Sequence, residues 1–129
     1  MKAPLGANYS LEHKALVICA LFAGIKFFSI SSLVGRSFFI CAHTFLTFMC
    51  LQASLTVTKL PRATDEFKVQ EKSKLKALVK SIILKVIVVC IVHAMTGLIP
   101  PLFVSSAFNT FAVLENGWTR NEISKIFGR

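Results

Sequence analysis

The feature that most constrains this chain is an uncharged stretch of 21 residues, Ser37–Val57, which is rich in phenylalanine. An α-helix needs about 20 mainly apolar residues to cross the hydrocarbon core of a bilayer. A run of this length without a formal charge therefore predicts a transmembrane helix. It is the most secure helix that the sequence predicts.

The composition supports the same class of protein. The chain has 129 residues, of which 54% are hydrophobic and 16% are charged, and its mean hydropathy is +0.66. Soluble domains usually carry about 25% charged residues. We therefore expect an all-α, integral membrane protein with one membrane domain, residues 1–129, and not a soluble enzyme.

A second apolar segment precedes the first one. It covers residues 15–34 and contains Lys26, which makes it a marginal span because a charge at the centre of a span is costly. The short break at Gly35 and Arg36 separates it from residues 37–57. The two segments are therefore predicted to form an antiparallel helical hairpin.

A third span is predicted at residues 82–99. The adjacent prolines Pro100 and Pro101 follow it, and they are expected to break the helix because each removes a backbone donor. The remaining apolar segment and tail cover residues 102–129. Three arrangements stay open for this segment: it lies at the interface, re-enters the membrane, or completes a kinked span. A re-entrant turn would put the C-terminus on the cytoplasmic side, and a single crossing would put it on the lumenal side.

Residues 59–80 form a polar, basic segment between the second and third spans. It carries seven basic and three acidic side chains, and the positive-inside rule makes it cytoplasmic. Thr64 is a plausible N-cap, so helical structure should resume there. Four lysines then follow at i, i+4 spacing. This lysine ladder consists of Lys68, Lys72, Lys76 and Lys80.

The lysine ladder has two interpretations. A basic stripe can contact ribosomal RNA phosphates or anionic lipid headgroups. The alternative is a solvated face that only marks the cytoplasmic side.

Several polar residues fall within the predicted spans, where ionisable groups often mark functional sites. We expect an intramembrane polar groove, although Lys85 could instead extend to the membrane surface. His43 and His93 suit a proton or metal site, but a neutral histidine hydrogen-bonded to a neighbouring helix is favoured. The predicted groove consists of Lys26, Ser29, Ser31, Ser32, Lys85 and His93.

No catalytic or phosphate-binding motif occurs in the sequence. The four cysteines lie within apolar runs at spacings that do not suggest a metal finger, so they are expected to act as small apolar residues. We therefore predict no enzymatic activity, no cofactor, no metal and no small-molecule substrate.

The C-terminal half resembles a known family in the order and spacing of short motifs. The motifs are Val79-Lys80-Ser81-Ile82, then His93, Pro101-Leu102-Phe103-Val104-Ser105-Ser106, Leu114-Glu115-Asn116 and Ile126-Phe127-Gly128. They look like the SRP-independent targeting protein 3 family, also described as a fungal inorganic phosphate transport protein family. The break between the first two helices departs from the family, where it is acidic and contains a proline.

The resemblance implies a small, multi-pass protein of the endoplasmic reticulum membrane. Its partners would be the Sec translocon, the ribosome, the lipid bilayer and nascent membrane-protein clients. It would help to target and insert membrane proteins without signal recognition particle.

Two other functions stay open. Small, basic proteins with few spans are typical accessory structural subunits of large membrane complexes, such as respiratory complexes. A small anion transporter is a further alternative. It would require an oligomer, and the spans lack both acidic residues and inverted repeats.

Overall fold

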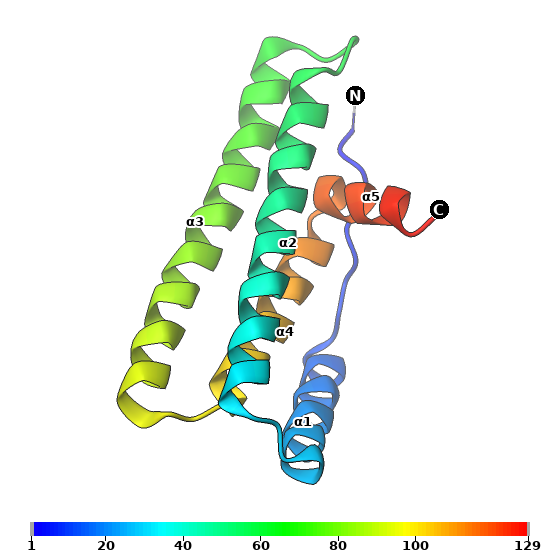
Figure 1. Cartoon of the computed structure of the whole chain (residues 1–129). Coiled ribbons are helices and arrows are strands. Elements are labelled where there is room, and N and C mark those ends of the chain that lie inside the picture. The colour runs from blue at the N-terminus through cyan, green and yellow to red at the C-terminus, as the bar shows by residue number, and fades with distance from the viewer. Residues whose placement is uncertain (1, 129) are drawn as a thin grey trace.

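The computed structural model describes residues 2–128 as a helical protein without β-strands (Figure 1). This confirms the predicted all-α class. The helices are α1 (Leu11–Phe28), α2 (Ser32–Thr58), α3 (Asp65–Thr96), α4 (Pro100–Glu115) and α5 (Gly117–Ile126).

The first four helices alternate in direction, and α4 is the central one, packing against all the others. Helix α4 has 16 residues, or about 24 Å, whereas α2 and α3 have 27 and 32 residues, or about 40 and 48 Å. The α2–α3 hairpin therefore extends well beyond α4. Helix α5 runs across the bundle near the end of α4, and the extended N-terminal segment passes alongside α5 (Figure 1).

The turn between α1 and α2 differs from the prediction. It lies at Ser29–Ser31 and not at Gly35 and Arg36, which are inside α2. Ser29 adopts a left-handed conformation with φ 50°, and the Ser31 side chain accepts the Val34 N–H as an N-cap. Gly35 is instead needed for close packing, because a Cβ there would lie 2.9 Å from Cγ2 of Ile99.

Helix α3 is longer than the predicted third span. It begins at Asp65 after Thr64, whose hydroxyl accepts the Phe67 N–H, so the predicted N-cap is confirmed. Only residues 59–64 form a loop, and the remainder of the predicted loop 59–80 is helical. Helix α3 ends at Thr96, where Gly97 takes a left-handed conformation.

The apolar run is divided close to the predicted position, at residues 97–99, but the prolines follow the break and do not themselves end α3. Pro100 and Pro101 begin α4, where the missing N–H groups cost nothing because the first turn of a helix has no intrahelical acceptors for them. The chain then returns alongside α3. Residues 102–115, whose arrangement the sequence left open, form most of the central helix.

The buried core has two clusters along α2. One contains Leu46 and Cys50 of α2, Ile82 of α3 and Val113 of α4. The other contains Ala53, Val57, Leu75 and Trp118 and attaches α5 to the hairpin.

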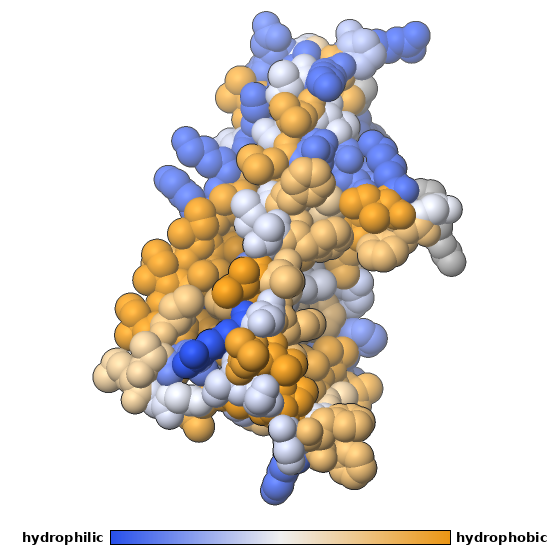
Figure 2. All heavy atoms as spheres, in the orientation of Figure 1, coloured by the Kyte–Doolittle hydropathy of each residue, from blue (hydrophilic) through white to orange (hydrophobic). Residues whose placement is uncertain are grey.

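The outside of the bundle is largely apolar away from the loop end of the hairpin. Figure 2 shows hydrophilic residues gathered toward the end with the α2–α3 loop and α5, and hydrophobic residues over much of the rest of this face. The large apolar side chains exposed on α2 and α3 include Phe38, Ile40, Phe48, Leu51, Leu55, Ile83, Leu84, Ile87, Val88, Ile91 and Met95.

Among the helices described, α2 is the one that is long and apolar enough to cross a membrane by length and composition. It contains the predicted span at residues 37–57. The spans at residues 15–34 and 82–99 stay predictions.

Candidate functional site

A buried polar cluster lies where α2 meets α4. Nδ1 of His43 is 2.9 Å from the Phe39 carbonyl oxygen, so this nitrogen carries the proton that it donates. Nε2 then accepts a hydrogen bond from Nδ2 of Asn109 at 2.8 Å. The histidine is therefore neutral and bonded to a neighbouring helix, which is the interpretation that we favoured. Within the described residues, Oδ1 of Asn109 is buried without a hydrogen-bond partner.

A second polar contact joins the far ends of α2 and α3. Nε of Arg36 donates to Nε2 of His93 at 3.0 Å, and Nδ1 of His93 is 2.7 Å from the carbonyl oxygen of Leu98. This geometry requires a neutral His93 with its proton on Nδ1. The contact fixes the turn between α3 and α4 against the start of α2.

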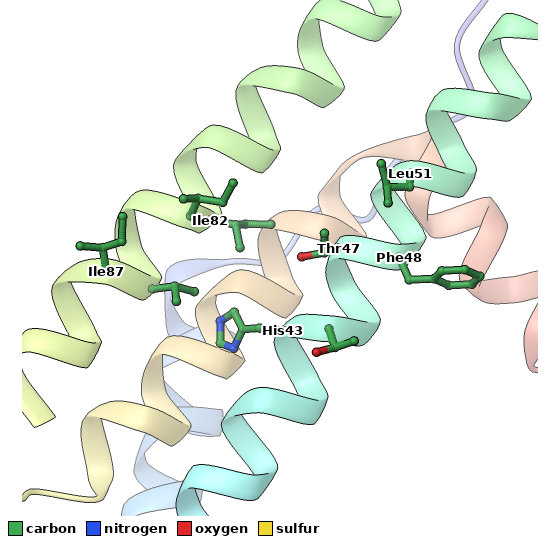
Figure 3. Close-up of a pocket in the computed structure, with 9 residues that line it drawn as sticks. His43, Thr47, Phe48, Leu51, Ile82 and Ile87 are labelled. Atoms are coloured by element: carbon green, nitrogen blue, oxygen red, sulfur yellow. The ribbon is translucent and has the colours of Figure 1, made fainter. Parts of the chain in front are cut away.

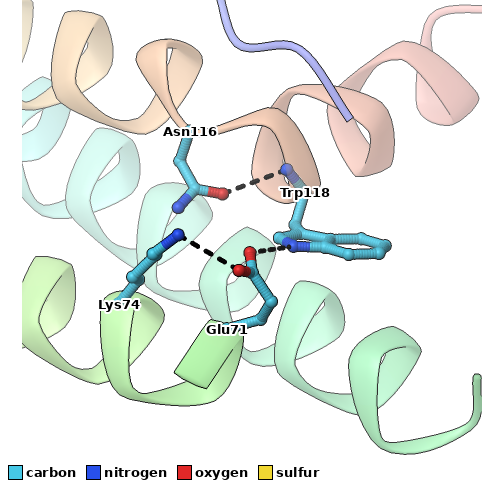
Figure 4. Close-up of polar contacts among 4 residues, drawn as sticks. All are labelled: Glu71, Lys74, Asn116 and Trp118. Carbon is cyan, nitrogen blue, oxygen red and sulfur yellow. Dashed lines mark hydrogen bonds and ion pairs between the residues drawn. The ribbon is translucent and has the colours of Figure 1, made fainter. Parts of the chain in front are cut away.

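The third polar contact attaches α5 to α3 (Figure 4). Nε1 of Trp118 donates to Oε2 of Glu71 at 2.8 Å, and Nζ of Lys74 lies 3.1 Å from Oε1 of the same carboxylate. Glu71 is buried, at 5% exposure. Asn116 caps α5 by accepting the backbone N–H of Trp118. All of these groups lie toward the end of the molecule that carries the α2–α3 loop and most of the lysines.

The lysine ladder lies on α3, where Lys72, Lys76 and Lys80 are exposed and Lys68 is half-buried. Lys72 and Lys76 line a groove of about 610 Å³ between α2 and α3. The hydroxyls of Ser54 and Ser73 belong to the same groove. This part of the seam is therefore cationic.

The seam between α2 and α3 continues past Leu51 into a second groove of about 500 Å³ (Figure 3). Its polar lining comes from His43, Thr44 and Thr47 of α2. The other lining residues are apolar: Phe48, Leu51, Ile82, Ile83, Val86 and Ile87. Leu51 lines both grooves, so the two adjoin at this residue along the seam, and together we call them the seam groove.

The structure does not bring the six residues of the predicted polar groove together. Lys26 is exposed in the last turn of α1, Ser29 and Ser31 cap helices at the α1–α2 turn, and Ser32 is the first residue of α2. Of these serines, Ser31 satisfies a free backbone group with its side chain, which accepts the Val34 N–H, and Ser29 ends α1 through its backbone N–H to the Ile25 carbonyl. Lys85 lies elsewhere, in a groove between α3 and α4 that also includes Ser105. His93 is buried against Arg36.

Sequence reasoning missed Asn109, Glu71 and Trp118 as parts of polar contacts. Asn109 lies 66 residues from His43, and Trp118 lies 47 residues from Glu71. One signal was present: Ser105 and Asn109 recur at i, i+4 within an apolar run, which places them on one face of a helix.

The described residues offer no clustered ligands for a metal ion. No group of three or more histidine, cysteine, aspartate or glutamate side chains is arranged to hold a metal ion within residues 2–128. The four cysteines are free thiols. The seam groove instead suits binding, because its part near Lys72 and Lys76 is cationic and its part near Ile82 and Ile87 is mainly apolar.

No family model matches the chain, and no curated protein or solved structure matches it either. The resemblance to the SRP-independent targeting protein 3 family therefore rests on the short motifs of the C-terminal half.

Proposed function

We propose that this protein is a biogenesis factor of the endoplasmic reticulum membrane that helps to insert membrane proteins at the ribosome-bound Sec translocon, independently of signal recognition particle. The observation that carries the proposal is the division of the molecule into an apolar helical block and a basic hairpin end. The motif resemblance supplies the particular process.

Membrane placement is supported by the outer surface of the bundle. Helices α1 and α4 have 18 and 16 residues, or about 27 and 24 Å, close to the hydrocarbon thickness of about 30 Å. A water-soluble protein rarely exposes apolar patches as extensive as those on α2 and α3. In this proposal α1, α4 and the adjoining parts of α2 and α3 lie in the bilayer, so the protein is multi-pass.

The distribution of charge supports one orientation. Most basic side chains lie toward the end with the α2–α3 loop, while Lys26 and Arg36 lie at the other end. The positive-inside rule assigns the loop end to the cytoplasm. Because the helices alternate in direction, the start of α1 and the end of α4 belong to the same side. The C-terminus would then be cytoplasmic, as expected for a re-entrant arrangement.

The proposed mechanism divides the work between the two parts. The basic hairpin end would face the ribosome, where lysines can pair with RNA phosphates. Within the membrane, Lys85 and Ser105 give the α3–α4 groove a polar side. Such a groove would lower the cost of moving the polar flank of a client through hydrocarbon, because an unpaired polar group in lipid is expensive.

The first test is to purify the tagged protein from its native membranes in mild detergent and to identify the bound proteins by mass spectrometry. Ribosomal proteins together with Sec translocon subunits would support the proposal. Subunits of a respiratory or other complex would favour an accessory structural role. Ion movement by the purified protein in vesicles would favour the transporter alternative.

A second test uses the lysine ladder itself. Replacing Lys68, Lys72, Lys76 and Lys80 with glutamate should abolish salt-sensitive association with ribosomes. The matched control replaces the same four residues with arginine, which keeps the charge and should keep the association. Unchanged association in the glutamate variant would contradict a ribosome-facing role.

A further inference from the structure

We propose that the seam groove between α2 and α3 binds one anionic glycerophospholipid. The headgroup would lie against Lys72 and Lys76, and one acyl chain would follow the apolar part of the seam. This inference rests on the membrane placement in the proposed function, but it requires neither the ribosome nor the translocon.

The upper part of the seam groove fits an anionic headgroup. Lys72 and Lys76 are one helical turn apart on α3, so both ammonium groups can approach one phosphate. Within residues 2–128 neither lysine takes part in an ion pair, whereas their neighbour Lys74 is paired with Glu71. Glu71 is buried on the α5 side and bonded to Trp118. The positive charge of the groove is therefore not neutralised by that carboxylate.

The lower part of the groove fits an acyl chain. From Leu51 to His43 it follows about 12 Å of α2, at 1.5 Å per residue. Ile82, Ile83 and Ile87 form its α3 wall (Figure 3). One end of the seam groove is cationic and the rest is mainly apolar, with three polar side chains from α2, which matches the polarity of a lipid in the cytoplasmic leaflet.

Other occupants fit less well. A transmembrane helix is about 10–12 Å across with its side chains, and α2 and α3 already pack together through Leu46, Cys50 and Ile82. A helix would have to part these contacts, but an acyl chain would lie over them. Phosphatidylcholine has no net negative charge, so it would gain little from the two lysines.

The test is native mass spectrometry of the full-length protein after reconstitution with equal amounts of phosphatidylserine and phosphatidylcholine. We expect one retained phosphatidylserine, in preference to phosphatidylcholine. The double variant Lys72→Gln/Lys76→Gln should lower retention about tenfold or more, since each lysine at an anionic surface contributes roughly a factor of five. The control Lys68→Gln/Lys80→Gln removes the same charge outside the groove and should retain the lipid.

A second pair of variants tests the apolar part without changing charge. Ile87→Trp would fill the seam groove and should reduce retention, whereas Ile91→Trp, one turn further along the exposed side of α3, should not. Both isoleucines are about half exposed, so neither change disturbs the core.

The inference is overturned if the wild-type protein retains the two lipids equally or if both double variants behave alike. Extraction of the protein from membranes by alkaline carbonate would instead contradict the membrane placement, and loss of ribosome association alone would contradict only the proposed function.

Discussion

The indole N–H of Trp118 donates to the buried carboxylate of Glu71 at 2.8 Å and thereby ties α5 to the outer part of α3. The same carboxylate is paired with Lys74. This contact links α5 to α3, whereas the rest of α5 packs mainly against α2 and α4. A buried carboxylate also depends on its partners, since an unpaired charge is costly in the interior.

Trp118→Phe should therefore destabilise the protein by about 1–3 kcal/mol, because it removes a donor from a buried carboxylate and leaves the aromatic packing. Thermal unfolding in detergent would measure the loss, and limited proteolysis should show earlier cleavage in α5. The control is Glu71→Gln, which keeps an acceptor for the indole and should cost less at this contact. Wild-type stability in Trp118→Phe would mean that packing alone holds α5.

Gly117→Ala should detach the N-terminal segment from the α4–α5 junction. A Cβ at this position would collide with the carbonyl of Pro4, and relieving the overlap requires the backbone to move, at a cost of about 1–3 kcal/mol. Gly24→Ala is the matched control, because no atom lies within 4 Å of its added Cβ. Proteolysis before α1 should accelerate only in the first variant, and equal rates would contradict the close packing.

His43 and Asn109 should show direct energetic coupling. A double-mutant cycle with His43→Ala and Asn109→Ala, followed by reversible unfolding in detergent, should give a coupling energy of about 0.6 kcal/mol and at most about 1.7, as found for hydrogen bonds between membrane helices. Ser124→Ala, on α5 and away from the cluster, should be additive with either change. A coupling energy near zero would show that the two side chains do not stabilise each other.

Glu122 should make the stability of the protein depend on pH in the acid range. Burial alone would raise its pKa, but hydrogen bonds from Thr56 and Lys125 and the charge of Lys125 outweigh this effect, and the pKa lies below its ordinary value of 4.5. The folded state therefore binds this proton more weakly than the unfolded state. The stabilisation is complete above about pH 4.5 and is lost as the pH falls through the lowered pKa.

The measurement is the difference in stability between the wild type and Glu122→Gln at several pH values. This difference should be positive near neutral pH and should shrink in acid below pH 4.5. Thr56→Val, which removes the hydroxyl that lies 2.5 Å from the carboxylate, should raise the pKa and move the transition toward pH 4.5. A difference that does not change with pH would contradict this account.

The sequence alone determined the helical class, the helix with the long uncharged run and the start of α3. These features depend on local rules, because an uncharged run of 21 residues favours a long helix and a threonine before two acidic residues favours an N-cap at Thr64. The spacing of the lysine ladder likewise depends only on residues that are close together in the sequence. No contact with a distant residue is needed to predict any of them.

Only the tertiary structure decided where the helices end and which polar groups meet. The α1–α2 turn lies at Ser29–Ser31, and Gly35 lies inside α2, where it packs closely against Ile99. His43 meets Asn109 because α4 packs against α2. Lys72 and Ser54 line the same groove because α2 and α3 are antiparallel neighbours. Helical periodicity fixes which face a residue occupies, but the partner of that face depends on how all five helices pack.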